Sequence, residues 1–229
     1  MPTNCGACGY AGCFNVAEAI ASGEVPVDFC PVAGEKTSLM IAEIMGAKAD
    51  SEKTKKVARV FCRGGNKEAK NVAEYQGVMD CKAANAISGG HKGCAFGCLG
   101  FGSCAAACPF GCIIMNENGL PVIDEDTCTA CGLCVKACPR NLIELVDKSK
   151  TIHVGCTSKD KGRDVRRVCS IGCIACRACV RVCEFDAIKV IDNIAIIDYE
   201  KCTNCGKCAE VCPTKTIQSI LLKEEAVRA

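Results

Sequence analysis

The sequence has few of the residues with which most globular enzymes build a core. It contains no tryptophan, and aromatic residues make up 4% of its 229 residues. No apolar run approaches the roughly 20 residues that a helix needs to cross a bilayer. The first residues, MPTNCGAC, have neither the basic nor the apolar segment of a signal peptide. We therefore expect a chain that is soluble as given, in a reducing compartment, with a core that large side chains alone do not fill.

The signatures of several functional classes are also absent. The dinucleotide-binding pattern GxGxxG does not occur between a strand and a helix, which argues against a nicotinamide or flavin fold. His91 and His153 are isolated, and no Ser/His/Asp set or pair of carboxylates is recognisable, so we predict no catalytic residue. Lysine and arginine form no long run with interleaved aromatics, which gives no indication of a nucleic-acid partner.

Cysteine, by contrast, is abundant, with 25 in the chain. In a short secreted protein this would suggest a disulfide scaffold, but the number is odd and most cysteines fall in closely spaced triplets, which favour metal binding. Three thiolates on one loop can bind three irons of one [4Fe–4S] cluster. In the pattern C-x2-C-x2-C-x3-C-P the fourth cysteine binds a second cluster instead.

This pattern occurs at residues 128–139 (CTACGLCVKACP) and 202–213 (CTNCGKCAEVCP), and residues 173–184 depart from it only in Glu184. Crossing the fourth cysteines between neighbouring motifs assigns two clusters to the second half of the chain. The first is predicted to be held by Cys173, Cys176, Cys179 and Cys212. The second is predicted to be held by Cys202, Cys205, Cys208 and Cys183.

The first half repeats the arrangement with longer spacers, Cys94-x3-Cys98-x5-Cys104-x3-Cys108. One predicted cluster has the ligands Cys94, Cys98, Cys104 and Cys138. The other has the ligands Cys128, Cys131, Cys134 and Cys108. Zinc is the alternative, because it also binds CxxC pairs, but zinc ribbons use separated pairs and not triplets followed by Cys-Pro.

The N-terminal block reads C-x2-C-x4-C-x16-C-P. Its ligands would be Cys5, Cys8, Cys13 and Cys30, with no histidine nearby. We predict a fifth [4Fe–4S] cluster here, since thiolates are soft ligands that suit iron–sulfur clusters, although zinc competes more strongly at this site. The chain is thus expected to bind five [4Fe–4S] clusters.

Residues 60–150 and 154–220 form an internal repeat. Each half opens with an apolar segment ending in cysteine, and its two motifs are separated by a strand–turn–strand, turning at Asn118-Gly119 or at Asp192-Asn193. The predicted fold class is α+β, with a small N-terminal [4Fe–4S] domain followed by two tandem two-cluster ferredoxin-like repeats. The expected boundaries are 1–33 for the N-terminal domain, 34–59 for a helix and linker, 60–150 for the first ferredoxin-like domain and 151–229 for the second.

Five cysteines remain outside these sets. Cys112 aligns with Ala187 of the second repeat and is interpreted as a small buried core residue. The other four form two pairs at corresponding places in the repeats: Cys62 with Cys81, and Cys156 with Cys169. They are compatible with reduced thiols, with two disulfides or with a sixth metal site.

The stretches CGACGYAGC, GCAFGCLGFGSCAAACPFG and TCTACGLCVKACP resemble the family of B subunits of the Rnf complex, as do residues 156–188. The similarity covers nearly the whole chain, and the two repeats match the longer form found in that family. The family's hydrophobic N-terminal anchor is missing from the sequence as given, so we expect either a chain from which the anchor has been removed or a natural soluble relative.

The resemblance implies a function. Rnf complexes are membrane ferredoxin:NAD+ oxidoreductases that couple electron flow to Na+ or H+ transport, and their B subunit is the proposed entry point for electrons. The implied electron donor is reduced ferredoxin. The implied partners are the other Rnf subunits, including the membrane subunits, and the implied location is the cytoplasmic face of the membrane. The alternative is an iron–sulfur subunit of another anaerobic oxidoreductase, of the hydrogenase or formate dehydrogenase type.

Overall fold

The structure is a computed structural model of the chain, and it describes residues 3–47 and 54–219. The N-terminal part contains α1 (Cys13–Ala21) and α2 (Gly34–Met45). The helix expected after residue 33 is confirmed, and it ends at Gly46 in the left-handed conformation (φ 60°). Much of the charged stretch expected to follow it lies outside the described residues.

The first repeat is built from two antiparallel strand pairs and three short helices. Strand β1 (Lys56–Val60) pairs with β4 (Ile143–Asp147), so that Val60 lies opposite Ile143. Strand β2 (Ile113–Met115) pairs with β3 (Pro121–Ile123). The helices are α3 (Cys81–Ala86), α4 (Ser103–Ala106) and α5 (Leu133–Ala137). The first strand starts at Lys56, inside the segment that was expected to be linker.

The second repeat has the same plan. Strand β5 (Ile152–Val154) pairs with β8 (Ile217–Ser219), and β6 (Ile188–Ile191) pairs with β7 (Ile194–Ile197), both antiparallel. Its helices are α6 (Gly162–Val168), α7 (Ala178–Arg181) and α8 (Lys207–Glu210). In each repeat the opening strand therefore pairs with the closing strand, and a hairpin lies between them.

Both predicted hairpins are present. The β6–β7 turn has positive φ at both central residues, Asp192 (49°) and Asn193 (63°), which matches the twist of antiparallel strands. In the β2–β3 connection Gly119 has φ 69°, and its N–H donates to the Asn116 carbonyl at 2.9 Å. Asparagine, aspartate and glycine tolerate this conformation better than other residues, which is why these positions were recognisable.

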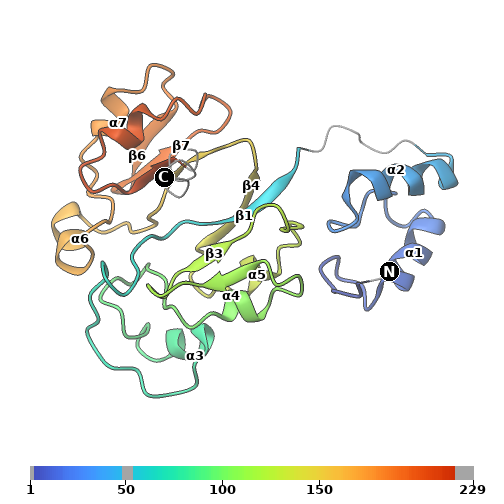
Figure 1. Cartoon of the computed structure of the whole chain (residues 1–229), viewed down its shortest axis with the longest axis horizontal. Coiled ribbons are helices and arrows are strands. Elements are labelled where there is room, and N and C mark those ends of the chain that lie inside the picture. The colour runs from blue at the N-terminus through green and yellow to red at the C-terminus, as the bar shows by residue number, and fades with distance from the viewer. Residues whose placement is uncertain (1–2, 48–53, 220–229) are drawn as a thin grey trace.

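Each repeat has its own small core, in which cysteines pack with isoleucine and valine. The two repeats lie against each other (Figure 1, cyan to yellow against orange to red). Backbone hydrogen bonds connect them: the N–H of Lys70 donates to the Val168 carbonyl at 2.8 Å, and the N–H of Ser170 donates to the Glu68 carbonyl at 3.0 Å. The junction between the repeats is therefore a defined packing surface.

Candidate metal centres

The three regular CxxCxxC loops share one backbone conformation. The residues on both sides of the middle cysteine have positive φ: Ala130 and Gly132, Ala175 and Arg177, and Asn204 and Gly206. The third cysteine of each loop then lies in a short helix, α5, α7 or α8. Two left-handed residues around one cysteine curl the chain, so that all three cysteines line one hollow.

Three hollows are lined by cysteine sets predicted from the spacing. A hollow of about 340 Å³ is lined by Cys173, Cys176, Cys179 and Cys212. Another, of about 320 Å³, is lined by Cys183, Cys202, Cys205 and Cys208. The third, of about 290 Å³, is lined by Cys108, Cys128, Cys131 and Cys134, together with Cys112. The crossed fourth cysteine is thus present in each hollow, while the binding of a cluster stays a prediction.

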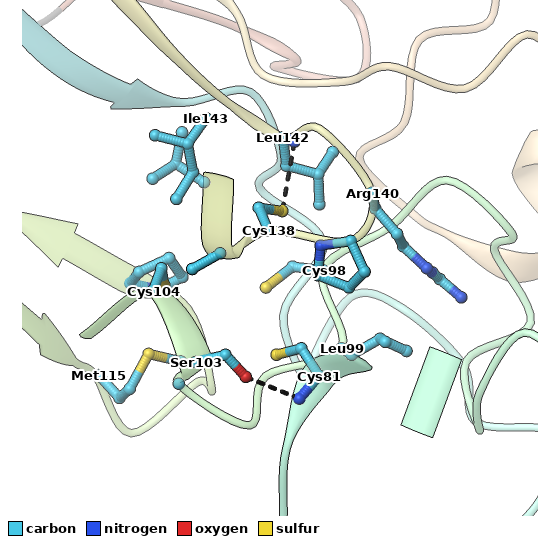
Figure 2. Close-up of a pocket in the computed structure, with 15 residues that line it drawn as sticks. Cys81, Cys98, Leu99, Ser103, Cys104, Met115, Cys138, Arg140, Leu142 and Ile143 are labelled. Atoms are coloured by element: carbon cyan, nitrogen blue, oxygen red, sulfur yellow. Dashed lines mark hydrogen bonds between the residues drawn. The ribbon is translucent and has the colours of Figure 1, made fainter. Parts of the chain in front are cut away.

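The fourth hollow departs from the prediction. It measures about 410 Å³ and is lined by Cys81, Cys98, Cys104 and Cys138 (Figure 2). Cys94 does not line it. It lines a separate hollow with Cys62, Cys156 and Cys169. The structure thus groups Cys98 with Cys81 and not with Cys94, which differs from the predicted set, while the binding of a cluster by either set stays a prediction.

The local backbone explains this exchange. Cys98 and Cys104 are six positions apart, like the first and third cysteines of the regular loops, and Phe101 stands where the middle cysteine would be. Gly100 (φ 83°) and Gly102 (φ 74°) reproduce the two left-handed residues around it. The equal spacing and the flanking glycines were the sequence signal that a fourth thiol had to come from elsewhere.

Packing around Phe101 brings Cys81 to the hollow. The Phe101 ring lies 5.1 Å from the ring of Tyr75 and 5.1 Å from that of His91, centre to centre. Cys81 is the first residue of α3, and its N–H donates to the Ser103 hydroxyl at 2.7 Å (Figure 2). That hydroxyl donates in turn to Asp80, whose carboxylate caps α3. Helix α3 is thereby held against the start of α4.

Arg140 closes the same region from the other side. Its guanidinium donates to the Cys94 carbonyl at 2.9 Å and to the side-chain oxygen of Asn85 at 3.1 Å, and also to the Gly89 carbonyl. One cation therefore fixes the loop that runs from α3 to Cys98. Burial lowers the pKa of Arg140, and nearby cysteines, Cys94 first, oppose that shift.

Backbone N–H groups point at several of the candidate ligands. The N–H of Leu142 donates to the Cys138 sulfur at 3.4 Å, and that of Ala187 to the Cys183 sulfur at 3.4 Å. At Cys212 burial raises the pKa, but hydrogen bonds from Ile217 and Thr214 outweigh it and lower the pKa. Such donors stabilise thiolates and tune iron–sulfur sites.

The third cysteine of each regular loop has a raised pKa. Burial raises the pKa of Cys134 and Cys179 to about 11 and that of Cys208 to about 12, and neighbouring cysteines raise it further. Four thiols in a small apolar space cannot all ionise unless a cation lies among them. The donor sets therefore fit a positively charged inorganic core with soft ligands.

A [4Fe–4S] cluster and a single metal ion need different arrangements of ligands. Within residues 3–47 and 54–219 no three Cys, His, Asp or Glu side chains are placed to hold one metal ion. In a [4Fe–4S] cluster each thiolate binds a different iron, so the ligands surround a space and need not meet at a point.

The N-terminal cysteines lie on a loop and at a helix start. Cys13 is the first residue of α1, and its N–H donates to the Asn4 side chain at 2.8 Å, while the Asn4 N–H donates to the Cys13 sulfur at 3.4 Å. The rings of Tyr10 and Phe29 meet edge to face at 5.9 Å, which ties the segment before Cys30 to the first loop. All four predicted ligands are half-buried, and their grouping stays a prediction.

Of the cysteines outside the predicted sets, Cys112 is 7% exposed, as expected of a core residue. Its sulfur also lies 3.3 Å from that of Cys108. None of the 25 cysteines, all of which are described, forms a disulfide in the structure. The two disulfides considered for the other four are therefore absent.

Comparison with known proteins agrees with these sites. Residues 2–32 match a family described as putative Fe-S cluster. Residues 121–144 and 195–218 match a 4Fe-4S binding domain, and residues 172–186 match another 4Fe-4S binding domain. No described helix is long and apolar enough to span a membrane.

Three relatives match most of the chain, and each is the B subunit of an oxidoreductase complex. The one from the Na(+)-translocating ferredoxin:NAD(+) oxidoreductase complex of Acetobacterium woodii is 49% identical over 93% of the chain, which spans 64% of that protein. The one from the ion-translocating oxidoreductase complex of Methanosarcina acetivorans is 44% identical over 94% of the chain and 81% of its own length. The one from the proton-translocating ferredoxin:NAD(+) oxidoreductase complex of Clostridium ljungdahlii is 43% identical over 95% of the chain and 77% of its own length. The chain belongs to the family of B subunits of ion-translocating oxidoreductase complexes of the Rnf type.

Proposed function

We propose that this chain is the iron–sulfur electron-transfer subunit of an Rnf-type ion-translocating ferredoxin:NAD+ oxidoreductase. It accepts electrons from reduced ferredoxin and relays them to the membrane subunits at the cytoplasmic face of the membrane. The observation that carries the proposal is the set of four hollows, each lined by a set of four candidate cysteine ligands, with two hollows in each repeat.

Five sets of cysteines are proposed as ligands of [4Fe–4S] clusters. When bound, each cluster supplies one-electron chemistry, at a potential near the roughly −400 mV typical of ferredoxins. The N-terminal set is Cys5, Cys8, Cys13 and Cys30. The sets of the first repeat are Cys81, Cys98, Cys104 and Cys138, and Cys108, Cys128, Cys131 and Cys134. The sets of the second repeat are Cys173, Cys176, Cys179 and Cys212, and Cys183, Cys202, Cys205 and Cys208.

The fold keeps the two sites of one repeat adjacent. Helix α5 carries Cys134, which lines one hollow, and Cys138 directly after the helix lines the other. In the second repeat Cys208 on α8 and Cys212 after it do the same. One helical turn thus separates ligands of neighbouring sites. This short separation supports electron transfer between the two clusters of a repeat without a conformational change.

The protein supplies shielding as well as ligands. Buried isoleucines such as Ile143 and Ile188 pack around the cysteines in each repeat and exclude water. Backbone N–H donors face the sulfurs, as described for Cys138 and Cys183. Both features tune the potential of an iron–sulfur site. In the proposed complex NAD+ is reduced on another subunit.

Rapid mixing of the anaerobically purified chain with reduced ferredoxin tests this function. We expect the visible absorbance of the clusters to decrease as ferredoxin is reoxidised. NAD+ added to the reduced chain alone is expected to stay oxidised. The proposal fails if dithionite reduces the chain but reduced ferredoxin does not, or if the purified chain is colourless and contains zinc.

A further inference from the structure

We propose that Cys62, Cys94, Cys156 and Cys169 hold a sixth [4Fe–4S] cluster at the junction of the two repeats. This site rests on the proposed iron–sulfur function and adds to it a connection between the repeats. Its ligands include three of the cysteines that the spacing left unassigned and the one that the structure removes from its predicted set.

The four cysteines line one hollow of about 380 Å³ between the repeats. The hollows at the four sites already described measure between about 290 and about 410 Å³, so its size is within their range. Four cysteines from the two packed repeats surround this hollow, the same number and kind of side chain as at the proposed cluster sites, which indicates the same kind of occupant.

The four thiols are near neighbours. Cys62 lies within electrostatic range of Cys94 and of Cys156, and Cys94 lies within range of Cys169. Gly64 makes the close approach possible: a Cβ on this residue would lie 3.0 Å from the Cys169 sulfur. The backbone of one repeat thus reaches a candidate ligand of the other.

The site has the same internal symmetry as the repeats. Cys62 comes two residues after β1, and Cys156 comes two residues after β5. Cys94 precedes Cys98 by four residues, and Cys169 precedes the equivalent Cys173 by four. Each repeat therefore contributes the same two cysteines, which replaces the predicted correspondence of Cys81 with Cys169.

Hydrogen bonds to the sulfurs repeat in the same way. The Cys62 sulfur accepts the N–H of Cys98 at 3.3 Å and also that of Gly64. The Cys156 sulfur accepts the N–H groups of Cys173 and Ser158, which are the equivalent positions. Two N–H donors on a buried sulfur are typical of iron–sulfur ligands, and both members of the pair have them.

These hydrogen bonds also place the site between two others. Cys98 belongs to the proposed set with Cys81, and Cys173 belongs to the proposed set with Cys176. One cluster of each repeat is therefore adjacent to the junction. The junction site would connect the two pairs: a cluster on one side would be oxidised by losing one electron and the next would be reduced by gaining it, with no bond made or broken on the chain.

Iron and acid-labile sulfide in the anaerobically purified chain test the site. Six clusters predict about 24 of each per chain, and five predict about 20. The double variant Cys62→Ser and Cys156→Ser is expected to lose about 4 of each. The matched control is Ser170→Ala, because Ser170 is exposed next to Cys169 and lines none of the hollows; it is expected to lose none.

Native mass spectrometry of the unsubstituted chain gives the number of clusters per chain even if the double variant does not fold. Six clusters support the junction site. Five clusters, with the thiols of Cys62, Cys94, Cys156 and Cys169 alkylated by a small reagent on the native protein, overturn it and leave the proposed function intact. A chain with zinc and no iron overturns both.

Discussion

The two repeats surround corresponding hollows with cysteines, but they take one of these cysteines from different segments of the chain. In the second, all three cysteines of each loop face one hollow, and the fourth comes from the neighbouring motif. In the first, one loop has Phe101 at the middle position, and Cys81 from a distant helix completes the set. The curled backbone of the loop, with Gly100 and Gly102 at positive φ, is the same in both. Loop conformation is thus kept while the source of one ligand changes.

The first repeat, in which the source of one ligand differs, also contains an insertion that the second repeat lacks. Cys62 and Cys94 are 32 positions apart, whereas the equivalent Cys156 and Cys169 are 13 positions apart. The additional residues form α3 and its flanking loops, which carry Cys81. Phe101, Tyr75 and His91 pack this insertion against the loop. The residue that replaces the cysteine therefore also anchors the segment that supplies the substitute.

The largest expected effect comes from removing the substitute ligand. Cys81→Ala should lose one cluster, about 4 iron per chain, because its hollow would keep only three thiols. Iron and sulfide analysis checks this, with Ser170→Ala as the control. Full iron content in Cys81→Ala, together with a loss in Cys94→Ala that removes the signals of the first repeat, would restore the grouping predicted from spacing.

A second substitution should make the first repeat like the second. Phe101→Cys in the Cys81→Ala background places a cysteine between the two left-handed glycines, as in the regular loops. We expect the lost iron, about 4 per chain, to return. A protein that stays at the lower iron content would show that the 98–104 loop does not have the regular conformation.

The pH dependence of the free energy of unfolding tests the contact between one pair of equivalent residues, one from each repeat. Arg59 and His153 occupy equivalent positions in the repeats and contact each other at the junction. Burial, and then the charge of Arg59, lowers the pKa of His153 to about 4. The unfolded chain, with a histidine pKa near 6.5, binds more protons between these values. Stability is therefore full above about pH 6.5 and is lost as the pH falls toward 4, by about 2–3 kcal/mol.

Unfolding at pH 7 and pH 5 measures this effect, with His153→Gln as the comparison. We expect the native chain to lose more stability between these values than the variant does. Because both proteins carry the same cysteines, acid lability of the clusters affects them equally. Equal losses in the two proteins would mean that His153 is not held neutral at the junction.

The smallest expected effect is on the reduction potential of one cluster, when a nearby positive charge is removed. Arg140 follows Cys138-Pro139 in the first repeat, and Thr214 follows Cys212-Pro213 in the second. Arg140→Thr removes a cation beside the set with Cys81, and we expect the potential of that cluster to fall by on the order of 40 mV, or about 1 kcal/mol at an effective dielectric between protein and water. Redox titration followed by EPR measures it. An unchanged potential would mean that solvent screens Arg140 completely.

Much of this arrangement could be predicted from the sequence because it is encoded locally. The triplet spacing and the Cys-Pro pairs specify three hollows, and the Asp192-Asn193 turn specifies a hairpin. The pairing of β1 with β4 depends on residues far apart in the chain, which local patterns do not reveal. Cys81 was missed for the same reason, since its position is determined by packing around Phe101. The spacing from Cys98 to Cys104 was the available clue.

Iron anomalous diffraction from crystals of the anaerobically purified chain is the most direct test of how the cysteines are grouped. We expect about six iron sites, each a four-iron cluster. One should be bound by Cys81, Cys98, Cys104 and Cys138, and another by Cys62, Cys94, Cys156 and Cys169 at the junction. Five sites, with Cys94 bound to the same cluster as Cys98, would contradict both assignments.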